Sequence, residues 1–281
     1  MIRRADMPDL VIACDESGFS GSNLLDPEWP EIVHASVDLT VPEAAGLIAA
    51  VRTGRGAEYK SNRLLRPEER PALEWFLRQL DGRAHVHRID KRTYVARRVL
   101  ELFTGEPSYG DGTRLGRAFD VRELRERTAF LDAFLILTRT KRLRLLDHDA
   151  IDQFFAHGPP ELSGVSRAHV EQTLLRLIDD DPAIPPPLEP LVPALAETVL
   201  FWGAGGRSVG VVHDEQSALT RRRVARLRAY LAEFADVDLA GFEQVDSRQD
   251  PRVQVADLLA GIARRGDHDV EDRSTAPTFR P

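Results

Sequence analysis

Residues 10–18 read LVIACDESG, an apolar run that ends in two carboxylic acids, a hydroxyl group and a glycine. The run contains Val and Ile, begins shortly after a proline and stops at Gly18, which predicts a buried β-strand rather than a helix. Asp15 and Glu16 then lie at the end of this strand. Ionised groups beside a core lose hydration and need a partner, a proton or a metal ion. The alternative is that Asp15 caps a turn and Glu16 is solvated, since Asp and Ser are common turn residues.

The composition predicts a folded protein, because 42% of the 281 residues are apolar and supply a substantial core. No apolar stretch approaches the ~20 residues that span a bilayer, and the first residues lack the apolar segment of a signal peptide. The single cysteine, Cys14, excludes a disulfide framework and a cysteine metal cluster. We therefore expect a cytoplasmic protein with no membrane partner.

The formal net charge of -7 argues against a protein that coats nucleic acid, because such binding depends on Lys and Arg side chains that neutralise phosphates. An enzyme that cleaves phosphodiesters needs only a local positive surface. Two basic clusters, at residues 139–144 and 221–228, are candidates for that surface. In the first cluster, Arg139, Lys141 and Arg142 are possible phosphate contacts.

Four further segments are predicted to be strands, at residues 31–39, 83–91, 208–213 and 239–247. The first of them follows residues 10–18 so closely that the two are expected to pair antiparallel. Residues 83–91 end in Asp90 and Lys91, and residues 208–213 are followed by Asp214. Within the former strand, His85 and His87 share one face; a partly exposed polar sheet face is favoured over a metal site, because no third ligand is near.

Helices are predicted at residues 42–51, 67–80 and 251–263, through most of 92–200, and in the basic segment after Asp214. In that basic helix the expected core stripe is Val224, Leu227, Leu231 and Phe234. In the last helix the expected core residues are Val255, Leu258, Leu259 and Ile262. Gln254, Asp257 and Gly261 lie along a separate face of the last helix, where Gly261 would allow another backbone or a substrate to approach closely.

An acid and a base two residues apart, Glu58 and Lys60, share one face if their segment is extended and would then reach one site. The alternative is an exposed ion pair worth less than ~1 kcal/mol.

Acids at the ends of several strands and on a late helix point to a metal site. Converging carboxylates repel one another unless divalent cations bind them, and oxygen-only ligands suit Mg²⁺ or Mn²⁺. Two such ions, about 3.5–4 Å apart, activate a water and stabilise the leaving oxygen of a phosphodiester. The residues therefore favour a nuclease-type site.

Together, these motifs resemble the bacterial and phage family called domain of unknown function thirty-eight hundred. The resemblance covers roughly residues 9–265 and is carried by Asp15-Glu16-Ser17-Gly18, Glu58-x-Lys60, Asp90-Lys91, Asp214 and Gln254-x-x-Asp257-Leu258-x-x-Gly261. It implies an α/β, ribonuclease H-like fold with a mixed sheet, an antiparallel opening hairpin and surrounding helices. We accordingly expect one domain over residues 1–265, with a large helical insertion at about 92–200. Residues 266–281, charged and without periodicity, are expected to be a disordered tail.

The resemblance implies that Asp15 and Asp257 bind metal, that Asp214 is the later-strand acid and that Glu58 supplies the remaining one. The long helical region leaves Asp90 in competition with Asp214, which is preferred because it follows the more apolar strand.

In the expected site, Asp15 bridges two metal ions, Asp214 and Asp257 hold one each, and Glu58 completes a shell or orients the water. Lys60 or Lys91 neutralises the scissile phosphate. Gln254 orients Asp257 or contacts the substrate. Glu16, which points away from Asp15 if the strand continues, is expected to form a structural salt bridge.

The leading hypothesis is a nuclease that depends on Mg²⁺ or Mn²⁺ and cleaves RNA or DNA. One alternative is a non-catalytic module that binds nucleic acid or a protein partner in a defence or mobile-element system. Another is a metal-dependent hydrolase of small phosphorylated molecules, which the negative net charge suits slightly better.

Overall fold

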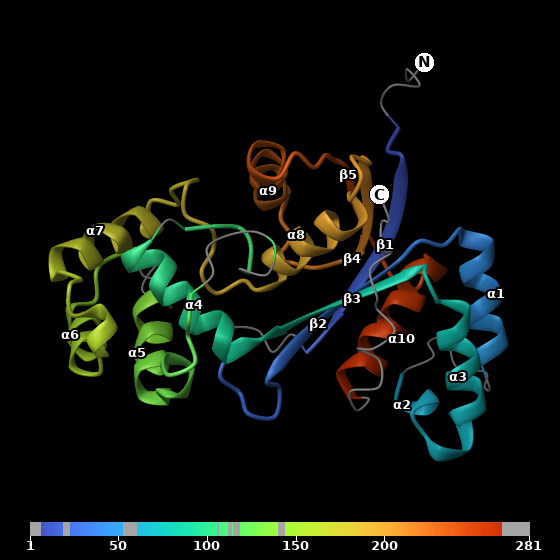
Figure 1. The fold of residues 1–281 in the computed structure, drawn as a ribbon, viewed down its shortest axis with the longest axis horizontal. Helices are drawn as coiled ribbons and strands as arrows, with labels where there is room; N and C mark the ends of the chain where they lie inside the picture. The colour runs from blue at the N-terminus through green and yellow to red at the C-terminus, as the bar shows by residue number, and fades with distance from the viewer. Residues whose placement is uncertain are drawn as a thin grey trace, which may run out of the picture. The chain divides into compact units, whose positions relative to one another are not determined.

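The computed structural model describes residues 7–18, 23–52, 61–105, 107–111, 114, 119–139 and 144–265. Its architecture is α/β: a mixed sheet of five strands in the order β3-β2-β1-β4-β5, with helices around it (Figure 1). The strands are β1 (Leu10–Ser17), β2 (Glu31–Val37), β3 (Ala84–Asp90), β4 (Val209–Asp214) and β5 (Leu239–Val245). β1 pairs antiparallel with β2 and parallel with β4, and β4 pairs parallel with β5. The predicted strands and the antiparallel opening hairpin are thus confirmed.

The described helices follow the predicted segments closely. They are α1 (Val41–Val51), α2 (Ser61–Leu64), α3 (Arg70–Gln79), α4 (Lys91–Thr104), α5 (Thr128–Arg139), α6 (His148–Ala156), α7 (Arg167–Ile178), α8 (Leu191–Trp202), α9 (Arg221–Phe234) and α10 (Pro251–Arg265). None of these described helices combines the length and the apolar character that crossing a membrane requires.

Local signals explain where several elements begin and end. β1 stops at Ser17 because Gly18 adopts a positive φ of 92°, which favours glycine. The hydroxyl of Thr40 accepts a hydrogen bond from the Glu43 N–H and completes a capping box at the start of α1. The predicted helix at 67–80 is instead a 3₁₀ turn (Pro67–Glu69) followed by α3. Pro71 has no backbone N–H and so cannot donate a hydrogen bond to the preceding 3₁₀ turn. Proline is tolerated in the first turn of an α-helix, and α3 accordingly begins at Arg70, with Pro71 in its first turn.

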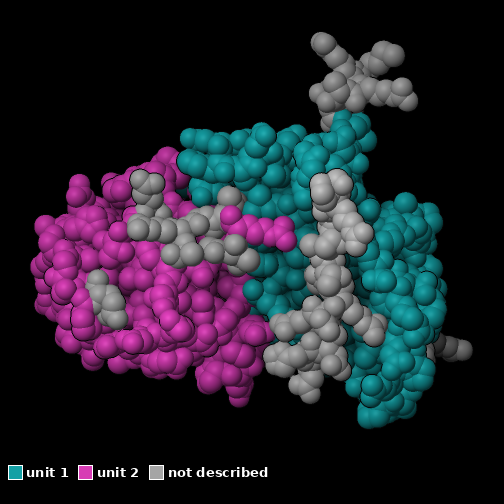
Figure 2. Space-filling view, in the orientation of Figure 1, with its two compact units in different colours: residues 1–19, 32–88, 194–281 teal, residues 20–31, 89–193 magenta. Residues whose placement is uncertain are grey.

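The chain divides into two compact units, which Figure 2 colours separately. Unit 1 comprises Met1–Phe19, Ile32–Arg88 and Ala194–Pro281 and holds nearly all of the sheet; unit 2 comprises Ser20–Glu31 and Ile89–Pro193 and holds α4 to α7. In unit 2, α5 buries apolar side chains that include Leu131, Phe134 and Leu137. The expectation that residues 92–200 are an insertion in a ribonuclease H-like domain stays a prediction.

Alternation along the strands gives the sheet of unit 1 two different faces. On one face, Ala13, Ala35 and Val212 join a hydrophobic cluster with residues of α1 and α10. The residues that alternate with them, among them His34 and His213, point to the other face, where His34 contacts Thr198 of α8. Asp15 and Asp214 share the face of Ala13 and Val212, whereas Glu16 lies on the face of the histidines.

The predicted core stripe of α9 is correct for Val224, Leu227 and Leu231 but wrong for Phe234, which is 61% exposed. α9 ends at Phe234, and the chain turns so that the Val237 N–H bonds to the Leu231 carbonyl. The side chain of Val237, just beyond this turn, is buried. The Phe234 ring stays exposed and lies against the Tyr230 ring, with ring centroids 4.7 Å apart.

The core stripe predicted for α10 is confirmed, because Val255, Leu258, Leu259 and Ile262 are all buried. Gly261 was expected to admit another backbone or a substrate; in the structure it admits the side chain of Ser61. A Cβ atom at Gly261 would lie 2.2 Å from the Ser61 Oγ and 2.7 Å from the Ser61 Cβ. The start of α2 therefore rests on α10 at a point where only glycine leaves room.

We predict that Gly261→Ala destabilises the protein by about 1–3 kcal/mol, because its methyl group overlaps Ser61. Gly46→Ala is the matched control: Gly46 is an exposed residue of α1, and nothing lies within 4 Å of the position that a Cβ atom would take there. Alanine at residue 46 is therefore expected to be neutral or stabilising. Urea unfolding monitored by circular dichroism measures both variants. Equal urea midpoints for Gly261→Ala and Gly46→Ala would contradict the close contact between Gly261 and Ser61.

Candidate active site

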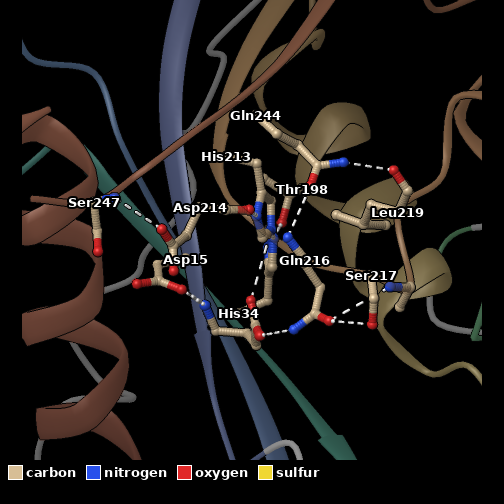
Figure 3. Close-up of polar contacts among 12 residues, drawn as sticks. Asp15, His34, Thr198, His213, Asp214, Gln216, Ser217, Leu219, Gln244 and Ser247 are labelled. Atoms are coloured by element: carbon tan, nitrogen blue, oxygen red, sulfur yellow. Dashed lines mark hydrogen bonds and ion pairs between the residues drawn. The ribbon is translucent and has the colours of Figure 1, made fainter. Parts of the chain in front are cut away.

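The carboxyl ends of the parallel strands β1, β4 and β5 meet at one edge of the sheet. Ligand sites of open α/β sheets commonly lie at such an edge. It carries Asp15, Asp214 and, just past β5, Ser247. Figure 3 shows the side chains of Asp15 and Asp214 near each other and apart from His213, Thr198 and Gln216.

Asp15 is the most strongly perturbed acid at this edge. It is 6% exposed. Burial, followed in order by the nearby carboxyl groups of Glu16, Asp257 and Asp214, raises its pKa to about 9. The Glu16 N–H donates a hydrogen bond of 2.7 Å to Oδ1 and acts in the opposite direction. Without a bound cation, Asp15 is therefore protonated at neutral pH.

Asp214 is held by the loop that follows β5. Its Oδ1 accepts a hydrogen bond of 2.9 Å from the Ser247 N–H. The side-chain amide of Gln254, on α10, donates a bond of 2.9 Å to the Ser247 carbonyl. Gln254 was expected to orient Asp257 or to contact substrate; its observed hydrogen bond supports the loop that orients Asp214.

Asp257 comes to this edge from α10, which packs on the Asp15 face of β1. Its side chain is half-buried, and its charge is one of those that raise the pKa of Asp15. Three acids predicted for the site, Asp15, Asp214 and Asp257, thus come from three elements and two of them act electrostatically on the third. The structure brings these predicted residues together.

The other residues predicted for the site are either outside the described residues or belong to unit 2. Glu58 and Lys60, like Lys141 and Arg142, are outside the described residues. Asp90, the competitor of Asp214, caps α4 in unit 2: its Oδ1 accepts a bond of 2.7 Å from the Thr93 N–H. Lys91 begins the same helix with a fully buried side chain. Arg139 lies in the last turn of α5, also in unit 2.

On the other face of the sheet, Glu16 joins a buried polar group that the sequence did not single out. Its Oε1 accepts a hydrogen bond of 2.5 Å from the Gln216 side-chain amide, and its Oε2 lies 3.9 Å from Nε2 of His213. A basic side chain next to Glu16 is thus His213, and this pair is a salt bridge only when the imidazole is protonated. The signal that could have identified these partners is the strand-end pair His213-Asp214, whose members alternate between the two faces.

His213 continues this polar group to His34 and Thr198. The Nε2 atoms of His213 and His34 are 3.1 Å apart, and Nδ1 of His34 is 2.8 Å from the Thr198 hydroxyl. Burial, followed by the neighbouring His213, His87 and His85, lowers the pKa of His34 well below its ordinary value. His34 is therefore neutral.

His85 and His87, considered above as a possible metal pair, belong to a stack of rings. The rings of His85 and Phe201 are 3.9 Å apart and nearly parallel, and those of His85 and His87 are 6.4 Å apart. His85 is buried, so this strand face is more enclosed than the sequence suggested.

The acids at the sheet edge are chemically suitable ligands for a divalent cation, but by themselves they do not form a complete coordination site. Their donors are oxygens, the preferred ligands of Mg²⁺ and Mn²⁺, and a cation would offset the mutual repulsion felt by Asp15. Within the described part of the chain, however, no group of three or more His, Cys, Asp or Glu residues is arranged to hold a metal ion. A cation bound here would draw on further ligands or on a small shift of these side chains.

No family model matches this sequence, and comparison with curated proteins and with solved structures finds no significant match. The functional argument therefore rests on the chain's own residues and their geometry.

The raised pKa of Asp15 predicts how stability depends on pH when metal is removed. In the unfolded chain Asp15 loses its proton near pH 4, but in the folded protein it keeps the proton up to about pH 9. The contribution of Asp15 to the free energy of unfolding is therefore largest below pH 4. It falls as the pH rises toward 9, by up to ~1.4 kcal/mol per pH unit. In EDTA, we expect Asp15→Asn to be more stable than the native protein at pH 8 and to match it near pH 4. Parallel curves of unfolding free energy against pH would contradict this.

Proposed function

We propose that the protein is a hydrolase of phosphodiester bonds that depends on Mg²⁺ or Mn²⁺ and acts on RNA or DNA. The observation that carries the proposal is Asp15, a carboxyl group buried at the end of β1 beside Asp214, Asp257 and Glu16. Such a group of acids is costly to a fold that contains no cation, and perturbed carboxyl groups of this kind are concentrated at functional sites.

In this proposal Asp15, Asp214 and Asp257 hold the cation, together with Glu58 from the sequence motif. When bound, the cation activates a water molecule and offsets charge on the phosphate oxygens. Asp15 would give up its proton on loading and offer Oδ2, while Oδ1 keeps the hydrogen bond from the Glu16 N–H. The Ser247 N–H fixes one oxygen of Asp214 and leaves the other for binding, and α10 presents Asp257 from a rigid element. Lys60 is the proposed partner of the scissile phosphate.

The proposal also draws on the resemblance of these same residues to the domain of unknown function thirty-eight hundred family. The residues that carry the resemblance include Asp15, Asp214, Gln254 and Asp257, which lie together in unit 1. A ribonuclease H-like domain is accordingly part of the proposal. Because a fold hosts many functions, the site and not the fold decides the activity.

A second candidate, a non-catalytic nucleic-acid-binding module, is favoured by α9. This helix carries five arginines and one glutamate in its sequence RRRVARLRAYLAEF. Arg222, Arg226, Tyr230 and Phe234 recur every fourth residue along one row of the helix, and the last two rings contact each other. Arginines beside solvent-accessible aromatic rings suit the phosphates and bases of a single strand.

We predict that cleavage of labelled RNA or DNA, single- or double-stranded, requires Mg²⁺ or Mn²⁺ and stops in EDTA. Asp15→Asn and Asp257→Asn are each expected to reduce the cleavage rate by at least ~100-fold, beyond the 10–100-fold typical of residues that only support a metal ligand. Asp149→Asn, which changes an exposed acid of α6 in unit 2, is the matched control and keeps the native rate.

The outcomes separate the hypotheses. Metal-independent binding of oligonucleotides that survives both substitutions at the sheet edge, without cleavage, favours the binding module. Cleavage of small phosphodiesters but not of oligonucleotides favours a hydrolase of small phosphorylated molecules. Cleavage that is equal in the native protein and in Asp15→Asn contradicts the proposed site.

A further inference from the structure

The parallel pairing between β1 and β4 stops immediately before the two acids. The last paired residues are Cys14 and His213, one residue short of Asp15 and Asp214. Each acid is still paired with the strand on its other side. Asp15 pairs with Ala35 of β2, and Asp214 pairs with Val245 of β5. Backbone pairing between β1 and β4 therefore ends one residue before the two acids and does not include them.

Side chains on the opposite face join the strand ends at this point. The amide of Gln216 donates to Glu16 Oε1 at 2.5 Å, and Glu16 Oε2 lies 3.9 Å from His213 Nε2. Glu16 directly follows Asp15, and His213 directly precedes Asp214. A contact between Glu16 and its two partners consequently fixes the backbone that carries both acids.

Gln216 is itself anchored to β5 and to the loop before α9. Its N–H donates a bond of 2.8 Å to Gln244 Oε1, and the amide of Gln244 donates a bond of 2.6 Å to the Leu219 carbonyl. The Glu215 N–H bonds to the Val245 carbonyl at 3.1 Å. The group that holds Glu16 is thus tied to the strand next to β4 and is not a loose loop contact.

The histidines add a chain of hydrogen bonds to this group. Nδ1 of His213 is 2.9 Å from the Asp214 carbonyl, which only accepts, so Nδ1 carries a proton. The Nε2 atoms of His213 and His34 are 3.1 Å apart, and Nδ1 of His34 is 2.8 Å from the Thr198 hydroxyl, so the chain continues to α8. His213 therefore holds the main chain of Asp214, while α8 fixes the position of the histidine pair.

We propose that Gln216, Glu16 and His213 form a bridge behind the sheet that positions Asp15 and Asp214 on its front. These are positioning residues, because they lie on the opposite face from the two acids. The part of this inference that concerns metal rests on the proposed function, whereas the positioning itself does not.

Gln216→Ala tests the bridge without changing any charge, and it leaves the N–H bond to Gln244 intact. Two backbone amides report on the acids: the Glu16 N–H donates to Asp15 and the Ser247 N–H donates to Asp214. In NMR spectra of the metal-free protein, we expect both amide signals to move in Gln216→Ala. Gln172→Ala, the same substitution at an exposed site of α7, is the control in which neither moves. Unmoved signals in Gln216→Ala would overturn the proposal.

Calorimetric titration with Mn²⁺ provides a second readout. Gln216→Ala is expected to bind Mn²⁺ about tenfold more weakly or worse, as residues that orient metal ligands commonly do, while Gln172→Ala binds as the native protein does. Equal affinity in native protein and Gln216→Ala would contradict the bridge. If the native protein binds no Mn²⁺, the proposed function fails, and the amide signals alone decide whether the bridge positions the acids.

Discussion

Asp15 is a carboxyl group that the fold keeps nearly out of water at the end of its central strand, with three further acids close enough to raise its pKa. Burial and like charge act in the same direction, and the hydrogen bond from the Glu16 N–H offsets them only in part. The metal-free protein resolves this conflict by keeping the proton. In the proposed function, Asp15 would release this proton when a cation binds, and the charge of the cation would offset the repulsion among the acids. The surrounding structure is organised about this one position.

The two faces of the sheet make different contacts at this edge. On the front, α10 supplies the hydrophobic cover, Asp257 and the glutamine that steadies the loop behind Asp214. On the back, the histidine pair and the hydrogen bond between Glu16 and Gln216 lie where the pairing of β1 with β4 has ended. Because side chains alternate along a strand, adjacent residues face opposite sides of the sheet: Asp15 faces α10, and Glu16 faces the histidines. Gly261 belongs to the same arrangement, since its missing side chain admits Ser61 against α10.

Much of this architecture was predictable from local pattern, because alternation and helical spacing report which face of an element is buried. The strand at residues 10–18 and the stripe through Val255 and Leu258 are examples. Phe234 fitted the spacing of a core residue but lies where α9 ends, and spacing carries no information about where a neighbouring chain turns. The bridge through Gln216 depends on contacts between residues 200 positions apart, which no local pattern encodes. The convergence of Asp15 and Asp257 was inferred from a family resemblance, since the spacing alone left it open.

The central claim is that the acids at the ends of β1 and β4 bind a divalent cation, and crystals of the native protein soaked in MnCl₂ test it most directly. Manganese scatters anomalously, so an anomalous difference map locates the ion without reference to any assay. The account predicts a peak within bonding distance of carboxylate oxygens of Asp15 and Asp214, and none there in Asp15→Asn. A fully soaked crystal with no peak at this edge, or with manganese bound only elsewhere, would contradict the account.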